Sequence, residues 1–499
     1  MSSRAWEARI FSVIVMRVMK NNTRKGSGQT SVISDSWGAG RAKNRSALTG
    51  EISTFRRRRK MLLYESRKIT LRAGEMLEKH VRNIFDYVAK QNEWRLRTVN
   101  LIASENVVSN TVRKLAGSDF AHRYAEGHPG ERYYQGTEFI DRIESDLRND
   151  FKTLFRCAQA DVRPVSGTNA NEAVFSSFLS HGDIVMANST PGGGHISHHL
   201  AGSVGKFTKN VIDFPLEKDG YSIDVGKALD LIRICRPKML IFGRSLFLFP
   251  EPIREFVDIA REYRILIIYD AAHVLGLMAG GRFQDPFDDG AFIVTGSTHK
   301  TYFGTQRGVI MSNMGNSEWQ KVDKGAFPGS SSNHHLDTLV GLAVATQEMI
   351  SFGREYGEHV VRNAKALGKA MKEAGFKVLA EENDFTESHQ VAADVREYGG
   401  GKMVSNLLKE NDIILNMNIL PHEPLRNVTN PDGIRIGVQE MTRAGMGTGE
   451  MEQIALLMHE CLAGGKEVRS EVNRLREGFK TVRYSFDEMM KDLPSPQNL

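Results

Sequence analysis

The middle of the chain alternates between short apolar runs and stretches with helical periodicity. The apolar runs cover Asp183–Ala187, Met239–Phe242, Ile265–Tyr269, Phe292–Thr295 and Val309–Met311, and the helical stretches include Asn169–Leu179, Val225–Ile234 and Ile253–Tyr263. Nearly continuous apolar strands that alternate with helices are typical of a parallel sheet with both faces covered. This pattern predicts the α/β fold class, with a mostly parallel sheet between helices.

Different patterns flank this region. On its N-terminal side, apolar residues recur at three- and four-residue steps from Leu77 to Val88, which predicts an amphipathic helix. On its C-terminal side, a long helical stretch begins at Leu336 and ends at Ala374. Short strands follow it at Lys377–Ala380, Ile413–Leu415 and Ile434–Gly437. The second pattern predicts a smaller α/β domain at the C-terminus.

The composition is that of a folded protein with several domains. Of the 499 residues, 40% are hydrophobic and 25% are charged, which excludes a disordered chain, a collagen and a coiled-coil rod. No run of about 18 apolar residues occurs, so we expect no membrane-spanning helix. We expect an extension over residues 1–60, a helical arm over 61–120, a large domain over 121–335 and a small domain over 336–499.

Charge separates the first 60 residues from the rest. They hold 14 Lys and Arg against three Asp and Glu, a net charge of +11, so the remaining chain carries −5 of the total of +6. They are also rich in Ser and Gly and lack apolar periodicity. We interpret them as a disordered extension or a start assigned too far upstream. A targeting peptide and a nucleic-acid-binding arm are the alternatives.

The cysteines indicate the compartment. Cys157, Cys235 and Cys461 are sparse and lack CxxC spacing, so the sequence predicts neither a disulfide framework nor a zinc or other metal site. They fit a reducing compartment, and we expect a cytoplasmic protein. Because the body of the chain is mildly acidic, we expect it to bind neither nucleic acid nor a membrane.

Polar residues follow several of the predicted elements. Ser166, Gly167 and Thr168 precede a helix, where hydroxyls and free N–H groups can bind an anion; an ordinary N-cap is the simpler interpretation of that segment alone. Asp270 comes directly after one strand, and Lys300 follows the next. Ligands of parallel sheets bind beyond the carboxyl ends of the strands, so we expect these groups to lie together.

An anion cup, an acid and a lysine in this order suit pyridoxal 5'-phosphate (PLP). The lysine would form an imine with the aldehyde, the acid would keep the pyridine nitrogen protonated, and the cup would bind the phosphate. A dinucleotide site is poorly supported, because no GxGxxG follows a strand and no GxxxxGK[ST] occurs.

Eight sequence blocks carry a resemblance to a known family. They are LIASEN (101–106), RYAEGHPGERYYQG (123–136), SGTNAN (166–171), GGHISH (193–198), YDAAHVLGL (269–277), GSTHKT (296–301), FTESHQV (385–391) and GIRIGVQEMTRAGM (433–446). With these blocks the chain resembles serine hydroxymethyltransferase, most closely its archaeal branch, over roughly residues 75–487. The resemblance implies PLP fold type I, which is an aspartate-aminotransferase-like fold.

The resemblance implies roles for the cofactor-binding residues. Lys300 would be the Schiff-base lysine, Asp270 would pair with the pyridinium nitrogen, and His195 would stack on the ring. His273 and Ser245 would lie near the phenolic oxygen; for Ser245 a turn serine is nearly as good an interpretation. The remaining implied cofactor contacts are Ser166, Gly167, Thr168, Ser297, His299 and Tyr124, of which His299 would orient rather than act as a base.

The resemblance also implies substrate contacts. Arg435 would clamp the substrate carboxylate with help from Ser104, because a guanidinium fork fits a carboxylate bidentately. Glu126 and Tyr134 would act near the serine hydroxymethyl group, with Glu126 as the proton shuttle, and their segment would cross a homodimer interface. Burial should therefore raise the pKa of Glu126. The implied pterin contacts are Asn418, Gly194 and Ile196; a loop-capping role is the alternative for Asn418.

The implied reaction is transfer of the serine hydroxymethyl carbon to a reduced pterin, tetrahydrofolate or tetrahydromethanopterin, leaving glycine. A pterin-independent threonine or 3-hydroxy-amino-acid aldolase or transaldolase is the alternative. Such relatives lose parts of the RYAEG segment, whereas Tyr124, Glu126 and Tyr134 are all present in this chain.

A few positions depart from the family pattern. Arg307 stands where the pattern has glycine, so we expect a large charge close to Lys300. Arg244 replaces a glycine beside Ser245, Gly192 replaces an acidic residue, and Met417 replaces a lysine before Asn418. We expect these changes to cluster around the site and to shift its preference for substrate or pterin.

Overall fold

The computed structural model describes residues 76–421 and 423–492, and the predicted extension over residues 1–60 lies outside them. The chain separates into two compact units, Met1–Tyr87 and Val88–Leu499, and the sheets and cavities belong to the second. A helix over residues 76–97 confirms the amphipathic pattern around Leu77 to Val88. None of the helices in the described ranges combines the length and apolar character that crossing a bilayer requires.

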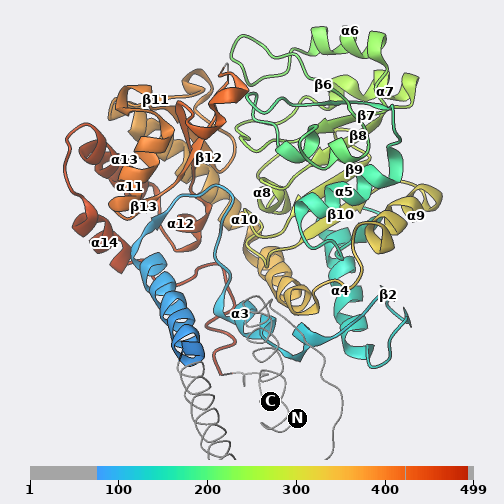
Figure 1. Cartoon of the computed structure of the whole chain (residues 1–499), viewed down its shortest axis with the longest axis horizontal. Helices are drawn as coiled ribbons and strands as arrows, with labels where there is room; N and C mark the ends of the chain where they lie inside the picture. The colour runs from blue at the N-terminus through green and yellow to red at the C-terminus, as the bar shows by residue number, and fades with distance from the viewer. Residues whose placement is uncertain (1–75, 422, 493–499) are drawn as a thin grey trace, which may run out of the picture. The chain divides into compact units, whose positions relative to one another are not determined.

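A seven-stranded sheet runs through the lobe of the second unit that lies on the right in Figure 1, in the order β4-β10-β9-β8-β7-β5-β6. The strands are β4 Gln159–Asp161, β5 Ile184–Ala187, β6 Asn210–Asp213, β7 Met239–Phe242, β8 Leu266–Asp270, β9 Ile293–Ser297 and β10 Gly308–Ser312. Five neighbouring strands, from β6 to β9, are parallel, and β10 is antiparallel to both of its neighbours. The mostly parallel sheet is therefore confirmed.

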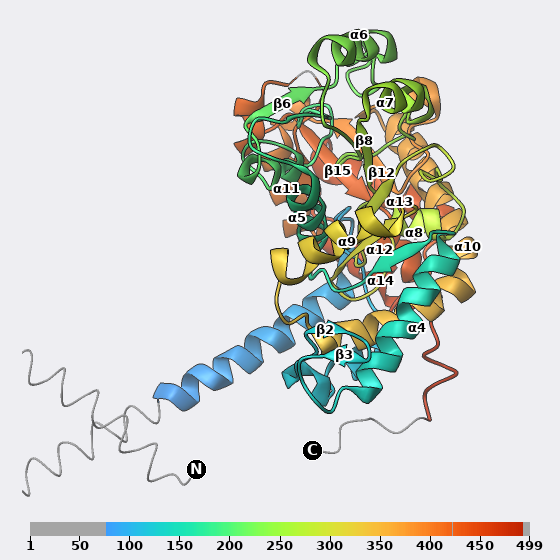
Figure 2. The same ribbon diagram turned by 90° about the vertical axis from the view of Figure 1, so that its right-hand side faces the viewer.

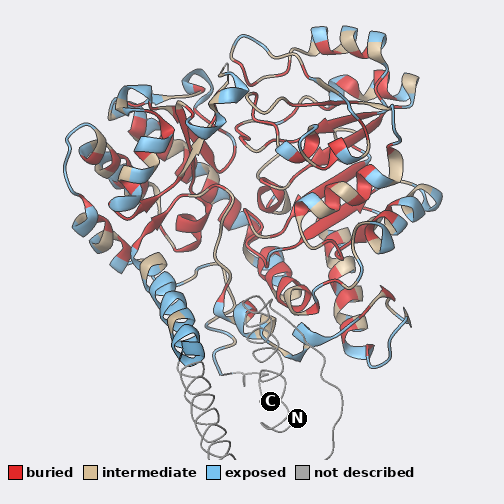
Figure 3. Ribbon diagram, in the orientation of Figure 1, coloured by how far each residue is buried: buried red, intermediate tan, exposed pale blue. Residues whose placement is uncertain are grey.

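The strands are apolar on both faces because helices cover both. In β7, Met239 and Ile241 pack in the cluster that contains the apolar residues of α5 (Gly167–Phe178), whereas Leu240 and Phe242 belong to the core on the other face. Figure 3 shows the resulting band of buried strands. The other helices of this region are α3 Asn110–Ala116, α4 Glu138–Leu154, α6 Val225–Cys235, α7 Val257–Tyr263, α8 Leu275–Ala279 and α9 Asn316–Lys324.

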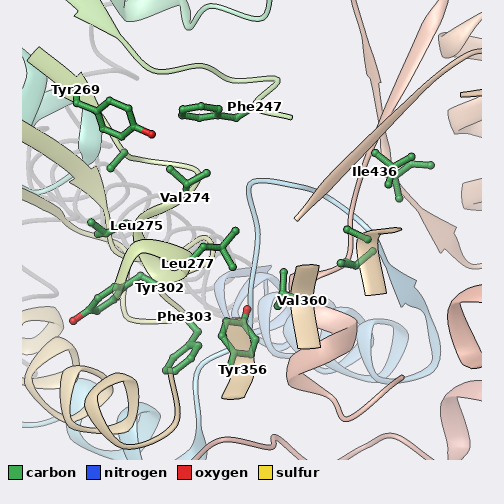
Figure 4. Packing of buried hydrophobic residues seen from close by; sticks show 14 of the residues in the cluster. Phe247, Tyr269, Val274, Leu275, Leu277, Tyr302, Phe303, Tyr356, Val360 and Ile436 are labelled. Atoms are coloured by element: carbon green, nitrogen blue, oxygen red, sulfur yellow. The ribbon is translucent and has the colours of Figure 1, made fainter. Parts of the chain in front are cut away.

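The long helix α10 (Leu336–Glu373) joins this region to a second one, as predicted for Leu336 to Ala374. Tyr356 and Val360 of α10 lie in the middle of the large apolar cluster (Figure 4). Leu277 and Phe303 contribute to the cluster from the side of the large sheet, and Ile436 contributes from the other side. One continuous core therefore connects both sheets.

The second sheet has four antiparallel strands in the order β11-β12-β15-β14. Its strands are β11 Lys377–Val378, β12 Gln390–Asp394, β14 Asn416–Asn418 and β15 Gly433–Gly437, and its helices are α11 Gly401–Glu410, α12 Gln439–Arg443, α13 Thr448–Leu462 and α14 Arg469–Glu477. Strand β1 (Val99–Asn100) pairs in parallel with β13 (Ile413–Ile414) in a separate two-stranded sheet. The Gly437 N–H at the end of β15 donates to the Leu101 carbonyl at 2.9 Å, which places the start of segment 101–106 beside the second sheet. The exact domain boundaries stay a prediction.

A short hairpin of β2 (Gly127–His128) and β3 (Glu131–Arg132) lies beside α4 at one end of the region (Figures 1 and 2). Arg132 fixes it there, since its guanidinium donates to Asp141 at 2.8 Å and to Glu144 at 2.7 Å, both on α4. The hairpin belongs to the segment that contains Tyr124, Glu126 and Tyr134, so this segment has a defined conformation within one chain.

Candidate active site

Lys300 lies in a cavity at the carboxyl end of the parallel strands. The cavity is lined by Gly167, Thr168, Asn171, His195, Arg244, Asp270, Ala272, His273, Ser297 and Lys300. Lys300 is only 8% exposed, and no residue in the described ranges hydrogen-bonds or pairs with its amine. Burial lowers the pKa of Lys300 to about 8, although the Asp270 carboxylate opposes this shift. The predicted meeting of Lys300 and Asp270 is thus observed.

The Asp270 carboxylate is fixed by three donors. Asn171 Nδ2 donates to Oδ2 at 2.7 Å, His198 Nε2 lies 2.9 Å from the same oxygen, and the backbone N–H of Ala272 donates to Oδ1 at 2.9 Å. Burial alone would raise the pKa of Asp270, but the hydrogen bonds from His198 and Asn171 outweigh it and keep the pKa well below its usual range. A carboxylate accepts about four hydrogen bonds, so one position remains for a ligand N–H.

The N-terminus of α5 faces the same cavity. Ser166 is its N-cap, and its hydroxyl accepts from the Asn169 N–H at 3.1 Å. The N–H groups of Gly167 and Thr168 lie in the first turn, where a helix offers no acceptor of its own. A Cβ at position 167 would collide with the Ser297 hydroxyl. Glycine therefore allows the helix terminus and Ser297 to form one narrow cradle that suits a phosphate.

His195 lies on the loop after β5 and is neutral at pH 7. Its Nδ1 is 2.7 Å from the Ser197 hydroxyl, and its ring is 5.9 Å from that of His198. Burial, with a smaller contribution from His198, lowers the pKa of His195 to about 4. A neutral ring that is oriented by Ser197 can stack on a flat ligand.

His273 belongs to a buried polar network below the cavity. Its Nδ1 accepts from Gln390 Nε2 at 2.8 Å, and its ring stacks on that of His389 with centroids 5.6 Å apart. Gln390 also donates to the Ser245 carbonyl at 3.1 Å. Burial keeps the pKa of His273 well below its usual value, so the ring is neutral. With Nδ1 occupied, Nε2 is left as the N–H donor.

Arg435 is a buried guanidinium that pairs with no carboxylate in residues 76–421 and 423–492. It lies on β15, is 7% exposed, and donates from Nη1 to the Ser245 carbonyl at 2.6 Å and hydroxyl at 2.8 Å. Nε and Nη2 share the Asn416 amide oxygen at 3.3 Å. Burial lowers the pKa of Arg435 to about 10, so it remains charged at pH 7. A buried cation that is solvated only by neutral oxygens is prepared for an anion.

Ser104 and His299 line a neighbouring cavity, together with Asn106 and Thr305 among others. His299 Nδ1 is buried and has no hydrogen-bond partner in the described part of the chain. Burial lowers the pKa of His299 to about 4. Although His299 precedes Lys300, it thus lines a different cavity, and its orienting role stays a prediction.

The segment with Tyr124, Glu126 and Tyr134 lies outside the Lys300 cavity. Tyr124 and Tyr134 are 52% and 43% exposed, and their rings meet edge to face with centroids 5.3 Å apart. Glu126 is half-buried. None of the three lines the cavity around Lys300, so one chain alone does not bring them to the lysine.

The three predicted pterin contacts lie on two elements. Gly194 and Ile196 flank His195 on the loop after β5, where Gly194 is buried and Ile196 is 48% exposed. Asn418 ends β14, and its amide donates to the Ile419 carbonyl at 2.6 Å. Met417 pairs with Ile434, the neighbour of Arg435, across the sheet.

The expectation that Arg307 brings a charge close to Lys300 is not met. Its guanidinium is fully buried and donates to the carbonyls of Val162 at 2.7 Å and His335 at 2.5 Å, and it does not line the Lys300 cavity. The carbonyls solvate the cation away from the site. Arg244, in contrast, lines the cavity as expected.

Four residues that meet at the site received no role from the sequence: Asn171, His198, Gln390 and Asn416. The sequence shows that each is polar, and the first three lie in the sequence blocks quoted above. Their roles come from contacts such as Asn171 with Asp270, 99 residues apart. The only usable signal was that Asn171 follows Gly167 by four residues and therefore shares its helix face.

A mostly parallel seven-stranded sheet with a buried lysine and a carboxylate at its strand ends defines the class of PLP-dependent enzymes of fold type I. A solved structure of the same fold, the L-threonine transaldolase from Pseudomonas fluorescens, superposes with a TM-score of 0.76 at 26% identity, covering 83% of this chain and 97% of that one. The sequence profile of serine hydroxymethyltransferase matches residues 77–458. The chain belongs to the serine hydroxymethyltransferase family.

Relatives with that name occur in several archaea. The chain is 46% identical over 409 residues to serine hydroxymethyltransferase of Archaeoglobus fulgidus, covering 81% of this chain and 93% of the relative. It is 46% identical over 411 residues to that of Pyrococcus horikoshii, covering 81% and 96%, and 45% identical over 397 residues to that of Methanosphaera stadtmanae, covering 80% and 94%. These findings confirm the resemblance to the archaeal branch.

Proposed function

We propose that this chain uses PLP to transfer the hydroxymethyl carbon of serine to a reduced pterin, leaving glycine. The observation that carries the proposal is a pair of buried cations without a carboxylate partner among the described residues: Lys300, whose pKa of about 8 makes it a usable nucleophile, and Arg435. An amine for a cofactor aldehyde and a fork for an α-carboxylate are what PLP chemistry on an amino acid requires.

The residues around Lys300 fit PLP. Lys300 Nζ would bind it covalently, the free acceptor position of Asp270 would bind its ring N–H, and the cradle of Ser166, Gly167, Thr168 and Ser297 would bind its phosphate. His195 would cover the ring face, and His273 and Ser245 would lie toward its phenolic oxygen. When bound, PLP supplies an electron-accepting ring that stabilises negative charge on the amino acid.

Arg435 would bind the carboxylate of serine through two N–H donors, with Ser104 as a further contact. Through this contact Arg435 would orient the bound amino acid relative to the cofactor, which supplies the electron-accepting ring for cleavage of the Cα–Cβ bond. Since the pKa of Arg435 stays at about 10, the clamp remains charged throughout the neutral range.

Glu126, Tyr124 and Tyr134 would complete the site from a second copy of the chain. The exposure of Tyr124 and Tyr134, and the absence of all three residues from the Lys300 cavity of the same chain, support a homodimer with shared sites. Glu126 would pass a proton to and from the serine hydroxyl. Gly194, Ile196 and Asn418 would contact the pterin, which is tetrahydrofolate or tetrahydromethanopterin, and we propose that the enzyme acts in the cytoplasm.

A pterin-independent aldolase or transaldolase for threonine or another 3-hydroxy amino acid is the second candidate. The solved structure of an L-threonine transaldolase with the same fold favours it. The presence of Tyr124, Glu126 and Tyr134 together favours the first candidate.

Purified protein loaded with PLP distinguishes the two candidates. We expect glycine to form from serine only with tetrahydrofolate or tetrahydromethanopterin, and threonine to be cleaved slowly. Threonine cleavage without any pterin that is faster than pterin-dependent glycine formation from serine would establish the second candidate. A protein that binds no PLP would contradict both.

A further inference from the structure

Arg244 and Glu251 form a buried ion pair beside the Lys300 cavity. Arg244 follows Gly243 at the end of β7 and lines the cavity itself. Its Nε donates to Glu251 Oε1 at 2.8 Å and its Nη2 donates to Oε2 at 3.0 Å. The two side chains are 6% and 1% exposed. Two parallel hydrogen bonds of this kind fix the orientation of both groups.

Both members of the pair also bond to the loop that contains His195. Arg244 Nη1 donates to the Gly192 carbonyl at 2.6 Å and to the Tyr221 carbonyl. Glu251 Oε1 accepts from Asn188 Nδ2 at 2.7 Å. The pair is therefore bonded to both ends of the segment 188–192, directly before His195.

The middle of the same loop, at Gly193, packs against the residues that follow β7. The Ser245 N–H donates to the Gly193 carbonyl at 2.6 Å. Gly193 has a φ of +94°, and a Cβ there would lie 2.6 Å from the Leu246 carbonyl oxygen. Beyond Gly193 the loop continues to His195 and to His198, which bonds to Asp270. A shift of the loop would therefore move His195, which lines the Lys300 cavity, and His198, which bonds to Asp270.

Charge distinguishes Arg244 from Arg435, although both lie next to Ser245. Arg435 donates to the Ser245 hydroxyl and has no carboxylate partner in the part of the chain that the structure describes, whereas Arg244 is neutralised by Glu251. The site thus gains a rigid guanidinium without a second free cation that would compete for the substrate carboxylate. Stability alone does not account for such a pair, because apolar residues can often replace a buried ion pair without lowering the free energy of unfolding.

We propose that Arg244 and Glu251 are positioning residues that fix the loop over residues 188–198, so that His195 lies on the face of the PLP ring and His198 bonds to Asp270. The proposal rests on the proposed function only in that the site binds PLP. It assigns a role to Arg244, one of the departures from the family pattern.

The test compares PLP binding by apoprotein variants. Arg244→Met leaves the Glu251 carboxylate buried and unpaired, so we expect a lower melting temperature. We also expect about a tenfold or larger increase in the Kd for PLP, the typical effect of losing a residue behind a binding group, and a changed visible circular dichroism of the bound cofactor, because His195 loses its fixed position.

A double variant separates positioning from stability. Arg244→Met with Glu251→Met removes the unpaired charge, so we expect the melting temperature to recover. The Kd and the dichroism should remain altered, because Gly192 and Asn188 still lack their partners. Recovery of both to wild-type values in the double variant would overturn the proposal.

Glu348→Gln is the matched control. Glu348 forms a buried ion pair with Arg443 at 2.7 Å, and both side chains are fully buried, but neither lines the Lys300 cavity. We expect it to lower the melting temperature and to leave the Kd for PLP and the dichroism unchanged. If Glu348→Gln changed the Kd for PLP and the dichroism as much as Arg244→Met does, PLP binding would depend only on overall stability. This result would also refute the proposal. A wild type that binds no PLP would contradict the proposed function itself.

Discussion

The two halves of the proposed site differ in how completely one chain assembles them. In the cofactor half, Asp270 accepts three hydrogen bonds and is 6% exposed, and His273 is 2% exposed with its Nδ1 bonded to Gln390. In the aromatic half, Tyr124 and Tyr134 are 52% and 43% exposed, and the neighbouring Tyr133 is 76% exposed. The side chains of the cofactor half are buried and hydrogen-bonded within one chain, whereas the aromatic side chains are exposed.

This difference shows which half is preorganised. Side chains that are buried and fully bonded keep their orientation before a ligand arrives, which is what an electrostatic site needs. Clustered exposed rings indicate a surface that another molecule covers. The cofactor half can therefore be tested with single variants, whereas the proposed sharing of the aromatic half is tested by mixing two variants of the chain.

Removing the amine at position 300 should have the largest effect. We expect Lys300→Ala to abolish covalent attachment of PLP after borohydride reduction and to lower turnover on the order of 10³-fold or more, because the nucleophile is gone. Mass spectrometry and an assay of glycine formation measure the two effects. Lys324→Ala, at an exposed lysine of α9, should retain attachment; attachment in Lys300→Ala would remove Lys300 from its assigned role.

Loss of the Glu126 carboxyl should have the next largest effect, and it tests the aromatic half. We expect Glu126→Gln to bind PLP normally and to lose roughly 100-fold or more of its turnover, the usual contribution of a positioned acid or base. In a dimer with shared sites, mixing this variant with Lys300→Ala gives heterodimers with one intact site. Remixing equal amounts should restore about a quarter of the sites.

Asp270→Asn mixed with Lys300→Ala is the control for that experiment. Both residues belong to the cofactor half of one chain, so every site in a heterodimer lacks one of them. We expect no recovery in this mixture. Without recovery in the mixture with Glu126→Gln, the aromatic segment would serve its own chain. Recovery in the control mixture would mean instead that Asp270 and Lys300 do not act in one site of the same chain.

The sequence predicted the cofactor-binding residues better than the residues that hydrogen-bond to them. Lys300 and Asp270 could be found because each directly follows an apolar strand, and parallel strands end at one edge. The parallel strands themselves could be predicted because they are buried on both faces and therefore form nearly continuous apolar runs. Strand β6 (Asn210–Asp213) was missed because it is an edge strand with an exposed, mixed pattern.

The supporting residues could not be predicted, because they depend on tertiary contacts. Gln390 lies 117 residues from His273 and Asn416 lies 19 residues from Arg435, and local periodicity carries no information about either contact. The same limit produced the error at Arg307. The residue is close to Lys300 in sequence, but its side chain lies among the carbonyls of Val162 and His335.

Substitution of the carboxylate clamp should change KM. We expect Arg435→Lys to raise the KM for serine roughly 10- to 100-fold, because a lysine loses the second charged hydrogen bond of the fork. Steady-state kinetics with serine measure it, and PLP affinity should remain unchanged. Arg396→Lys, at an exposed arginine beside β12, is the control, and an unchanged KM in Arg435→Lys would refute the clamp.

The pH dependence of PLP capture should show the smallest effect, and it tests the burial of the amine directly. Only the unprotonated amine attacks the aldehyde. Burial lowers the pKa of Lys300 to about 8 from 10.5. The capture rate of the apoprotein, followed by absorbance, should therefore rise about tenfold between pH 7 and pH 9 and then level off.

An exposed lysine would behave differently, because its capture rate would still rise above pH 10. Asp270 opposes the downward shift of the Lys300 pKa, so Asp270→Asn should move the plateau to lower pH. A plateau that stays in place in Asp270→Asn would mean that the carboxylate does not act on the amine. A wild-type rate that keeps rising past pH 10 would mean that the amine is solvated, and the cofactor half would then be no more complete than the aromatic half.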